Sequence, residues 1–238
     1  MAAVEVKNLV KKYGSMDAVK GISFSINEGE IFGLIGPNGA GKTTTLRVLS
    51  TLLSINSGTV TILGHDLSKQ SGEIRKLISY LPEDAGAYKN LTGRAYLQFI
   101  ANFFDQKEVP TIVKKGIEIA DLGARIDDRV DTYSKGMMRR LLVGRALMTN
   151  PKLAILDEPT SGLDVINAQE IRKLVKSTAQ KGTTVLLSSH NMLEVEYLCD
   201  RIALISDGKI VEEGKPKALM EKYKARNIEE VFIRTVHE

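Results

Sequence analysis

Apolar residues recur along the chain with two periods, one typical of strands and one typical of helices. The places where the period changes predict how the fold is organised. Ser23-Phe24-Ser25-Ile26 alternates polar and apolar residues with the period of two that is typical of a half-buried strand. Strands are predicted at 4–8, 19–26, 31–35, 59–63 and 78–81, and a helix at 41–53. The first third of the chain is therefore expected to be rich in β-structure.

The rhythm changes between residues 83 and 150, where three helices are predicted in succession. They span 92–104, 111–122 and 134–149, with Thr92 as a cap of the first and Gly123 as the stop of the second. Tyr96, Phe99, Ile100 and Phe103 share one face of the first helix, which we expect to be its packed face. Three helices without a strand between them indicate a helical lobe inserted into a sheet.

Strands and helices alternate again after residue 150, which favours a mostly parallel sheet with buried strands. Strands are predicted at 153–156, 184–188, 202–205 and 210–211, and helices at 164–180, 192–199, 216–224 and 228–235. We expect a single α/β domain over 1–238. It consists of a core (1–82 and 151–211), a helical subdomain (83–150) and a short helical tail (212–238).

Composition narrows the class of protein further. The 238 residues carry a net charge of only +4, and no basic run exceeds two residues, as in Lys11-Lys12 and Arg139-Arg140, so no nucleic-acid surface is expected. Cys199 is the only cysteine, which excludes an internal disulfide and favours a reducing compartment. No apolar stretch is long enough to span a membrane and no secretory signal is recognised, so a cytoplasmic location is expected.

The segment Gly36-Pro-Asn-Gly-Ala-Gly-Lys42-Thr43 matches the phosphate-binding loop motif and joins a predicted strand to a predicted helix. Glycines let backbone N–H groups approach phosphate, and the following helix start adds positive potential. Lys42 would contact the β- and γ-phosphates, and the Thr43 hydroxyl would ligate Mg²⁺. The expected nucleotide-binding residues of this loop are Gly36, Pro37, Asn38, Gly39, Ala40, Gly41, Lys42, Thr43 and Thr44.

Two carboxylates end the apolar strand Leu153-Ala-Ile-Leu-Asp157-Glu158. If this strand lies beside the strand of the phosphate loop, Asp157 would reach the metal ion, usually through water. Glu158 would face the γ-phosphate and act as a general base toward the attacking water. ATP and Mg²⁺ are therefore the expected cofactors.

Over essentially its whole length, the chain resembles the ATPases of ABC transporters. Tyr133-Ser-Lys-Gly-Met137 occupies the place of that family's signature sequence, and Ser161-Gly-Leu-Asp164 matches its D-loop. His190 follows a predicted strand as the family's switch histidine does, and Tyr13 matches the aromatic residue that stacks on adenine. The resemblance implies a phosphate-loop NTPase core with an antiparallel β subdomain and an inserted helical subdomain.

The same resemblance assigns roles to these residues. Ser134, Lys135 and Gly136 would bind the nucleotide held by a second subunit, so that two nucleotides lie between two chains arranged head to tail. Asp164 would organise that seam, and His190 would contact the γ-phosphate. The second subunit is either a second copy or a paralogous ATPase.

Glu83 departs from the family pattern, because the family usually has glutamine after the strand 78–81. A carboxylate near a triphosphate is tolerable beside a metal ion or when protonated. The resemblance to exporter-type ATPases, which also share the Tyr-Ser-Lys-Gly signature, implies that Glu83 is a catalytic residue that also contacts Mg²⁺. The alternative is a turn carboxylate outside the site.

The resemblance implies an ATPase that powers transport, and export in particular, through a separate membrane permease. The chain would then lie on the inner face of the cell membrane, with residues 83–150 carrying the contact and 83–96 beside the permease. The alternative is a soluble ABC-type ATPase that acts on ribosomes or nucleic acid. A GTPase or nucleotide kinase is a third hypothesis, but the chain lacks the Asn-Lys-x-Asp motif of GTPases.

Overall fold

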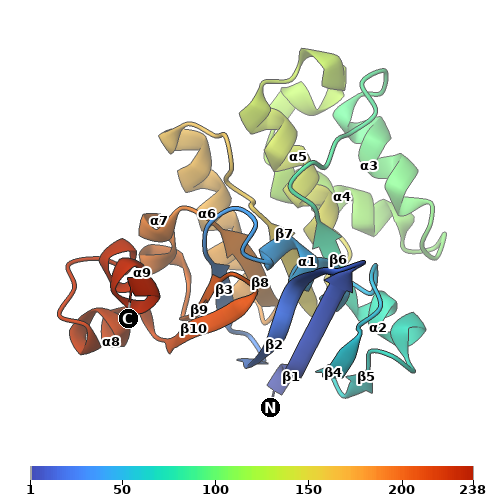
Figure 1. Cartoon of the computed structure of the whole chain (residues 1–238). Helices are drawn as coiled ribbons and strands as arrows, with labels where there is room; N and C mark the ends of the chain where they lie inside the picture. Colours follow the sequence, from blue (N-terminus) through green and yellow to red (C-terminus); the bar gives the residue numbers. More distant parts are fainter. Residues whose placement is uncertain (1, 238) are drawn as a thin grey trace.

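The computed structural model describes residues 2–237, and in that range two β-sheets pack against each other with helices around them (Figure 1). The larger sheet holds six strands in the order β10-β9-β3-β8-β7-β6. These strands are β10 (Lys209–Gly214), β9 (Arg201–Ser206), β3 (Ile31–Ile35), β8 (Thr184–Ser189), β7 (Leu153–Asp157) and β6 (Ile78–Leu81). Every residue of β3, β7 and β8 is buried, as expected of parallel strands covered on both faces.

The smaller sheet has four antiparallel strands in the order β2-β1-β4-β5. They are β2 (Met16–Asn27), β1 (Ala2–Tyr13), β4 (Ser57–Ile62) and β5 (His65–Asp66). Its core side chains face the large sheet, where Phe24 stacks on Phe32 of β3 with ring centroids 5.4 Å apart. The fold class is thus confirmed as an α/β core with a mostly parallel sheet, an antiparallel β part and inserted helices.

Helices cover the large sheet on two sides. The sheet lies between two clusters of core residues, one on each of its faces. Phe32 and Leu34 of β3 pack toward the small sheet and α1, whereas Ile31 and Ile35 face the opposite cluster, which includes residues of α6 and α7. The helices outside residues 83–150 are α1 (Lys42–Leu49), α2 (Ser71–Leu77), α6 (Val165–Gln180), α7 (Met192–Leu198), α8 (Pro216–Lys222) and α9 (Ile228–His237).

The segment between β6 and β7 forms a separate helical lobe at one end of the molecule (Figure 1). It contains α3 (Gly93–Ala101), α4 (Val109–Ala120), α5 (Lys135–Leu147) and two short 3₁₀ helices (Gly123–Asp127 and Val130–Thr132). Thr92 and Ser134 cap α3 and α5 by accepting hydrogen bonds from the backbone N–H groups of Ala95 and Met137. These caps fix where two of the three predicted helices begin.

The structure corrects two expectations at the level of single elements and adds two elements that were not predicted. The predicted helix 41–53 ends at Leu49, since Thr51 has a φ of +61°, which no helix continues. The predicted packed face of the helix 92–104 is only partly packed: Tyr96 is buried, whereas Phe103, which follows the end of α3 at Ala101, is 74% exposed. Helix α2 and strand β5 were not predicted, because their polar sequences carry no clear apolar period.

Candidate functional site

The phosphate loop leaves the carboxyl end of β3 and enters α1, as the motif predicts. Two backbone hydrogen bonds anchor it to distant parts of the chain. The Gly36 N–H donates to the carbonyl oxygen of Ser189 (3.2 Å), and the Gly208 N–H donates to that of Ala40 (3.0 Å). The loop is therefore held by the end of β8 and by the turn between β9 and β10.

Close packing explains why glycine stands at both ends of this loop. A Cβ on Gly36 would lie 2.1 Å from the carbonyl oxygen of Ile205, and one on Gly41 would lie 2.6 Å from that of Ala18. Gly41 also has a φ of +103°, and it begins α1 without a side-chain cap. The first N–H groups of α1 thus face no capping side chain and can bind an anion.

Lys42 lies beneath the loop and is only 5% exposed. Its Nζ donates to the carbonyl oxygens of Gly36 (2.7 Å) and Pro37 (3.2 Å). The same Nζ lies 3.4 Å from Oε1 of Glu158, so the lysine and the predicted base form an ion pair. A buried, fixed ammonium group at this position can supply positive charge to an anion bound in the loop.

Asp157 ends β7 with its carboxylate buried among hydroxyl groups. Oδ1 accepts hydrogen bonds from Ser188 Oγ (2.5 Å) and Thr43 Oγ1 (3.2 Å), and Oδ2 accepts one from the Tyr80 hydroxyl (3.4 Å). Burial, and then the negative charge of Asp157, raise the pKa of Tyr80 to about 12, so its hydroxyl remains a donor. Thr43 and Asp157 offer hard oxygen ligands side by side, which fits Mg²⁺.

Glu158 occupies a backbone conformation that is unusual for its residue type. Its φ is +48°, and its N–H donates to Ser188 Oγ (3.0 Å) as the chain leaves the sheet. The carboxylate is buried, with Oε2 2.9 Å from Nδ1 of His190. Oε1 contacts Lys42 without hydrogen-bond geometry and has no hydrogen-bond partner among the described residues. This oxygen is therefore available to accept a proton from water.

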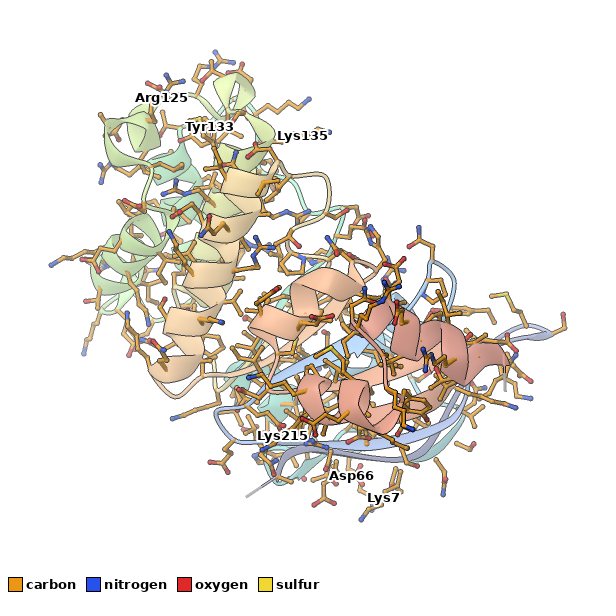
Figure 2. The ribbon with its side chains drawn as sticks, turned by 90° about the vertical axis from the view of Figure 1, so that its left-hand side faces the viewer. Lys7, Asp66, Arg125, Tyr133, Lys135 and Lys215 are labelled. Carbon is orange, nitrogen blue, oxygen red and sulfur yellow. The ribbon has the colours of Figure 1, made fainter. Side chains whose placement is uncertain are left out.

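The residues of the predicted signature form a second group at the start of α5. Ser134 caps the helix, and Ser134 and Lys135 are exposed. Gly136 packs against α6, where a Cβ on it would lie 2.2 Å from Oδ1 of Asn167. Figure 2 shows Tyr133 and Lys135 at the outer end of the helical lobe, close to Arg125, whose carbonyl oxygen accepts a hydrogen bond from the Tyr133 hydroxyl (2.8 Å).

Asp164 caps α6 and connects this group to the loop that follows β7. Its Oδ1 accepts from the Asn167 N–H (2.9 Å) and its Oδ2 from the Asn167 side-chain amide (2.6 Å). These hydrogen bonds lower the pKa of Asp164. Asn167 therefore links the segment 161–164 to Gly136 of the signature within one chain.

Glu83 and Tyr13 were predicted to belong to the site. In the structure their side chains form no hydrogen bond or ion pair with Lys42 or Asp157. Glu83 Oε1 accepts a hydrogen bond from Ser161 Oγ (3.3 Å), and the Glu83 carbonyl oxygen accepts one from Arg139 (3.1 Å). Tyr13 ends β1 with its ring 41% exposed, and Lys11 Nζ lies 5.7 Å from the ring centre. Both roles remain predictions.

The structure adds residues that the sequence did not single out. Tyr80, Arg139 and Asn167 contact the predicted site residues from neighbouring elements, and Gly208 fixes the phosphate loop through its backbone. Ser188 is paired with Asp157 in the parallel β7–β8 register. Only Ser188 had a usable signal, since it ends the strand before His190; the other contacts depend on pairings between distant segments.

Comparisons with known proteins place the chain in a family. A family model described as ABC transporter matches residues 19–161. The linearmycin resistance ATP-binding protein LnrL of Bacillus subtilis (strain 168) is 36% identical over 237 residues, covering 99% of this chain and 76% of that protein. The Nod factor export ATP-binding protein I of Burkholderia orbicola (strain AU 1054) is 35% identical over 234 residues, covering 98% and 77%.

Solved structures agree. An ATP-binding subunit of an ABC transporter superposes with a TM-score of 0.86 at 26% identity, over 98% of this chain and 99% of that one. A dimeric ATP-binding cassette in a post-hydrolysis state, bound to ADP and Pi, superposes with a TM-score of 0.78 at 26% identity, over 89% and 98%. In residues 2–237, no helix is long and apolar enough to span a bilayer. The chain belongs to the ABC transporter family and is an ATP-binding subunit with ATPase activity.

Proposed function

We propose that the chain hydrolyses ATP to drive export through a separate membrane permease. The observation that carries the proposal is the placement of Glu158, whose buried carboxylate lies between Lys42 and His190 at the end of β7. A carboxylate in this position can take a proton from a water that attacks the γ-phosphate, while His190 orients that water. The loop 36–44 would bind the phosphates, and Tyr13 would stack on the adenine.

Mg²⁺ would be held by the Thr43 hydroxyl and by Asp157, with Glu83 approaching from the neighbouring strand. When bound, the ion would offset the negative charge of the phosphates. Ser188 and Tyr80 support this role, because their hydroxyl groups hold the Asp157 carboxylate in place.

The second half of the site would come from another ATPase chain, either a second copy or a paralogue. Ser134 and Lys135 are exposed at the start of α5, at the outer end of the lobe, where Figure 2 shows Lys135, and Gly136 follows them against α6. A capped helix start is a phosphate-binding group. Closure of two chains on two nucleotides would be the power stroke, and hydrolysis would reverse it.

The test is the conservative substitution Glu158→Gln. We expect ATP to bind normally and hydrolysis to fall by about 10²- to 10⁴-fold, as is typical when a general base is removed. Phosphate release and equilibrium binding of a fluorescent ATP analogue measure the two quantities separately. A variant that hydrolyses ATP at the wild-type rate contradicts the role given to Glu158.

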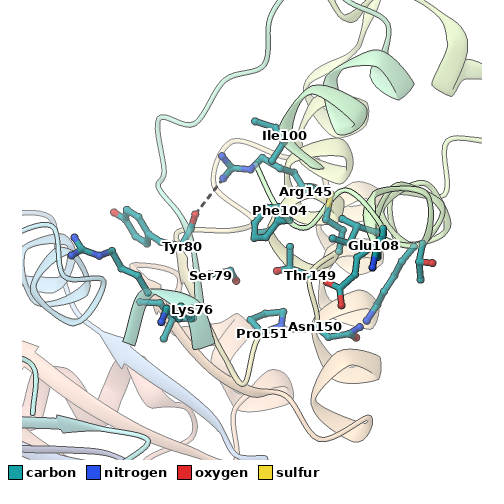
Figure 3. A pocket seen from close by; sticks show the side chains of 18 residues that line it. Lys76, Ser79, Tyr80, Ile100, Phe104, Glu108, Arg145, Thr149, Asn150 and Pro151 are labelled. Carbon is teal, nitrogen blue, oxygen red and sulfur yellow. Dashed lines mark hydrogen bonds between the residues drawn. The ribbon is translucent and has the colours of Figure 1, made fainter. Parts of the chain in front are cut away.

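A permease contact is supported by a cleft of about 660 Å³ between the lobe and the core. Figure 3 shows its walls, formed by β6 and the end of α2 on one side and by α3, α4 and the end of α5 on the other. Arg145 donates across it to the carbonyl oxygen of Tyr80 (3.2 Å). The cleft residues include five cations and the carboxylate of Glu108: Arg75, Lys76, Lys107, Lys115 and Arg145 supply the positive charges.

An exposed aromatic row continues from the cleft along α3. Tyr88, Phe99 and Phe103 contact edge to face, with ring centroids 5.3 and 5.4 Å apart, and Phe104 at the cleft is also exposed. Exposed aromatic side chains that gather in one place mark an interaction surface. The proposed occupant is a cytoplasmic helix of the permease with apolar and acidic residues, which would hold this chain at the inner face of the membrane.

Charge reversal tests this contact. We expect the double variant Lys107→Glu with Lys115→Glu to lose most copurification with the membrane fraction, because like charges replace complementary ones. Lys217→Glu, on the exposed surface of α8, is the matched control and should copurify as the wild type does. Equal retention of both variants, or recovery on ribosomes in place of membranes, would contradict the proposed partner.

A further inference from the structure

Glu83 poses an electrostatic problem that the proposed function leaves open. It follows β6 and lies one strand away from Asp157 and Glu158, at the end of the sheet that holds the phosphate loop. A third carboxylate near a triphosphate is repelled unless a cation offsets it. Lys42 is already paired with Glu158, so a cation of the protein itself that offsets Glu83, whether or not Mg²⁺ is bound, has to come from elsewhere.

Arg139 on α5 is placed to supply it. The residue is 9% exposed, and its Nη2 donates to the backbone carbonyl oxygen of Glu83 (3.1 Å). Its Nη1 is buried and lacks a hydrogen-bond partner among the described residues. Because a guanidinium group stays charged in proteins, a buried and unpaired N–H face of it is costly and favours a nearby anion.

Three carboxylates act electrostatically on this guanidinium group, and they differ in the partners that each of them has. Burial lowers the pKa of Arg139, while the negative charges of Glu83, Asp157 and Glu158 raise it, with Glu83 contributing most of the three. Asp157 is held by three hydroxyl groups, and Glu158 by Lys42 and His190. In the described part of the chain, the Glu83 carboxylate accepts one hydrogen bond, from the uncharged hydroxyl of Ser161 (3.3 Å).

We propose that Arg139 is a positioning residue for Glu83 and supplies the countercharge that lets this loop carry a carboxylate beside the nucleotide. Nη2 of the guanidinium group holds the backbone carbonyl of Glu83. Nη1 is left to interact with the Glu83 carboxylate. Since Arg139 lies five residues after Ser134 on the same helix, the signature side and Glu83 would move together. The inference rests on the proposed role of Glu83 at the nucleotide.

A rescue experiment tests the pair by steady-state ATP hydrolysis and nucleotide binding of the purified chain. Arg139→Gln should lower kcat by about 10- to 100-fold, since it leaves a carboxylate uncompensated. Adding Glu83→Gln should restore kcat to within about threefold of Glu83→Gln alone, because a neutral amide needs no countercharge. Arg139→Lys should lie between, as it keeps the charge and loses the planar fork.

Arg140→Gln is the matched control on the same helix. Arg140 donates instead to Ala120 (3.0 Å) and to Asp121 at the end of α4. Whatever kcat this variant loses, Glu83→Gln should not restore it. If Arg139→Gln does not fold alone, the double variant should still fold and turn over as Glu83→Gln does; a double variant that fails to fold overturns the inference.

Two results separate this inference from the proposed function. If Arg139→Gln costs the same kcat in the wild-type chain and in the Glu83→Gln variant, Arg139 has a packing role only and the pairing is overturned. In that case wild-type hydrolysis and its dependence on Glu158 would still stand. A wild-type chain without ATPase activity would instead contradict the proposed function itself.

Discussion

Two groups of candidate nucleotide-binding residues differ in burial. The phosphate-loop side contains Lys42 and Glu158, and the signature side contains Ser134 and Lys135. Lys42 and Glu158 are 5% and 4% exposed, and each has charged or polar partners inside the chain. Ser134 and Lys135 are exposed, and beside Asp164 the apolar side chains of Val165 and Ile166 are 79% and 74% exposed. One side is assembled by the fold, whereas the other presents its groups outward.

The difference shows what each side can do alone. Buried partners fix the geometry of Lys42 and Glu158 before a nucleotide arrives, so the first side can bind phosphate in a single chain. Exposed donors on the second side are in contact with water, and their affinity for phosphate is weak until a second surface excludes it. If the proposed composite site is formed, a single chain offers one prepared half-site and one incomplete half-site.

The largest difference between the two sides is expected on substitution of their lysines, Lys42 and Lys135. Lys42→Ala should weaken ATP binding by a single chain by about 100-fold or more, because it removes the buried cation at the phosphates and leaves Glu158 unpaired. Lys135→Ala should leave binding by the single chain unchanged. Isothermal titration at protein concentrations that keep the chain monomeric measures both; equal losses would mean that the two sides do not differ.

Ser134→Arg sharpens the comparison on the exposed side. A bulky cation at the start of α5 should block closure and lower hydrolysis by at least about tenfold, while the single chain still binds ATP. Hydrolysis measured against protein concentration distinguishes this from a folding defect, because the wild-type rate per chain should rise with concentration and the variant rate should not. A variant with wild-type concentration dependence would count against a composite site.

Gly136→Ala probes the link between the signature and α6. Alanine normally stabilises a helix relative to glycine, but here its Cβ would meet Asn167, so unfolding should become easier by about 1–3 kcal/mol. Asn167→Ala in the same chain should remove most of that loss. Gly72→Ala in α2, where a Cβ meets nothing within 4 Å, is the control and should not destabilise. Urea unfolding measures all of them.

The smallest effect is expected at high pH. The pKa of Tyr80 is raised from 10.0 to about 12, so the fold favours the neutral phenol. Its contribution to stability is complete below pH 10 and is lost as the pH rises toward 12. Tyr80→Phe should remove the last step of tyrosine ionisation followed by ultraviolet absorbance. An unchanged titration would mean that Tyr80 is not the last tyrosine to ionise and that its pKa is not raised in this way.

Sequence patterns predicted most of the sheet and the prepared half-site, for physical reasons. Strands β3 and β6 matched their predicted bounds, and β3 shows the continuous apolar run that is typical of a buried parallel strand. Lys42, Thr43, Asp157, Glu158 and His190 lie together because the phosphate loop and the ends of β7 and β8 meet at one sheet edge. The contacts of Arg139 and Asn167 could not be predicted, because they depend on how α5 packs against loops distant in sequence.

The backbone anchors of the phosphate loop have a consequence for tolerance to change. Its two ends are tied by the main chain of Ser189 and Gly208, so no side chain is required for either tie. The exposed residue at 38 can vary without releasing the loop, whereas an insertion in the hairpin at Asp207 would shift it. Insertions or deletions in the β9–β10 hairpin are therefore expected to abolish nucleotide binding as readily as changes in the phosphate loop itself.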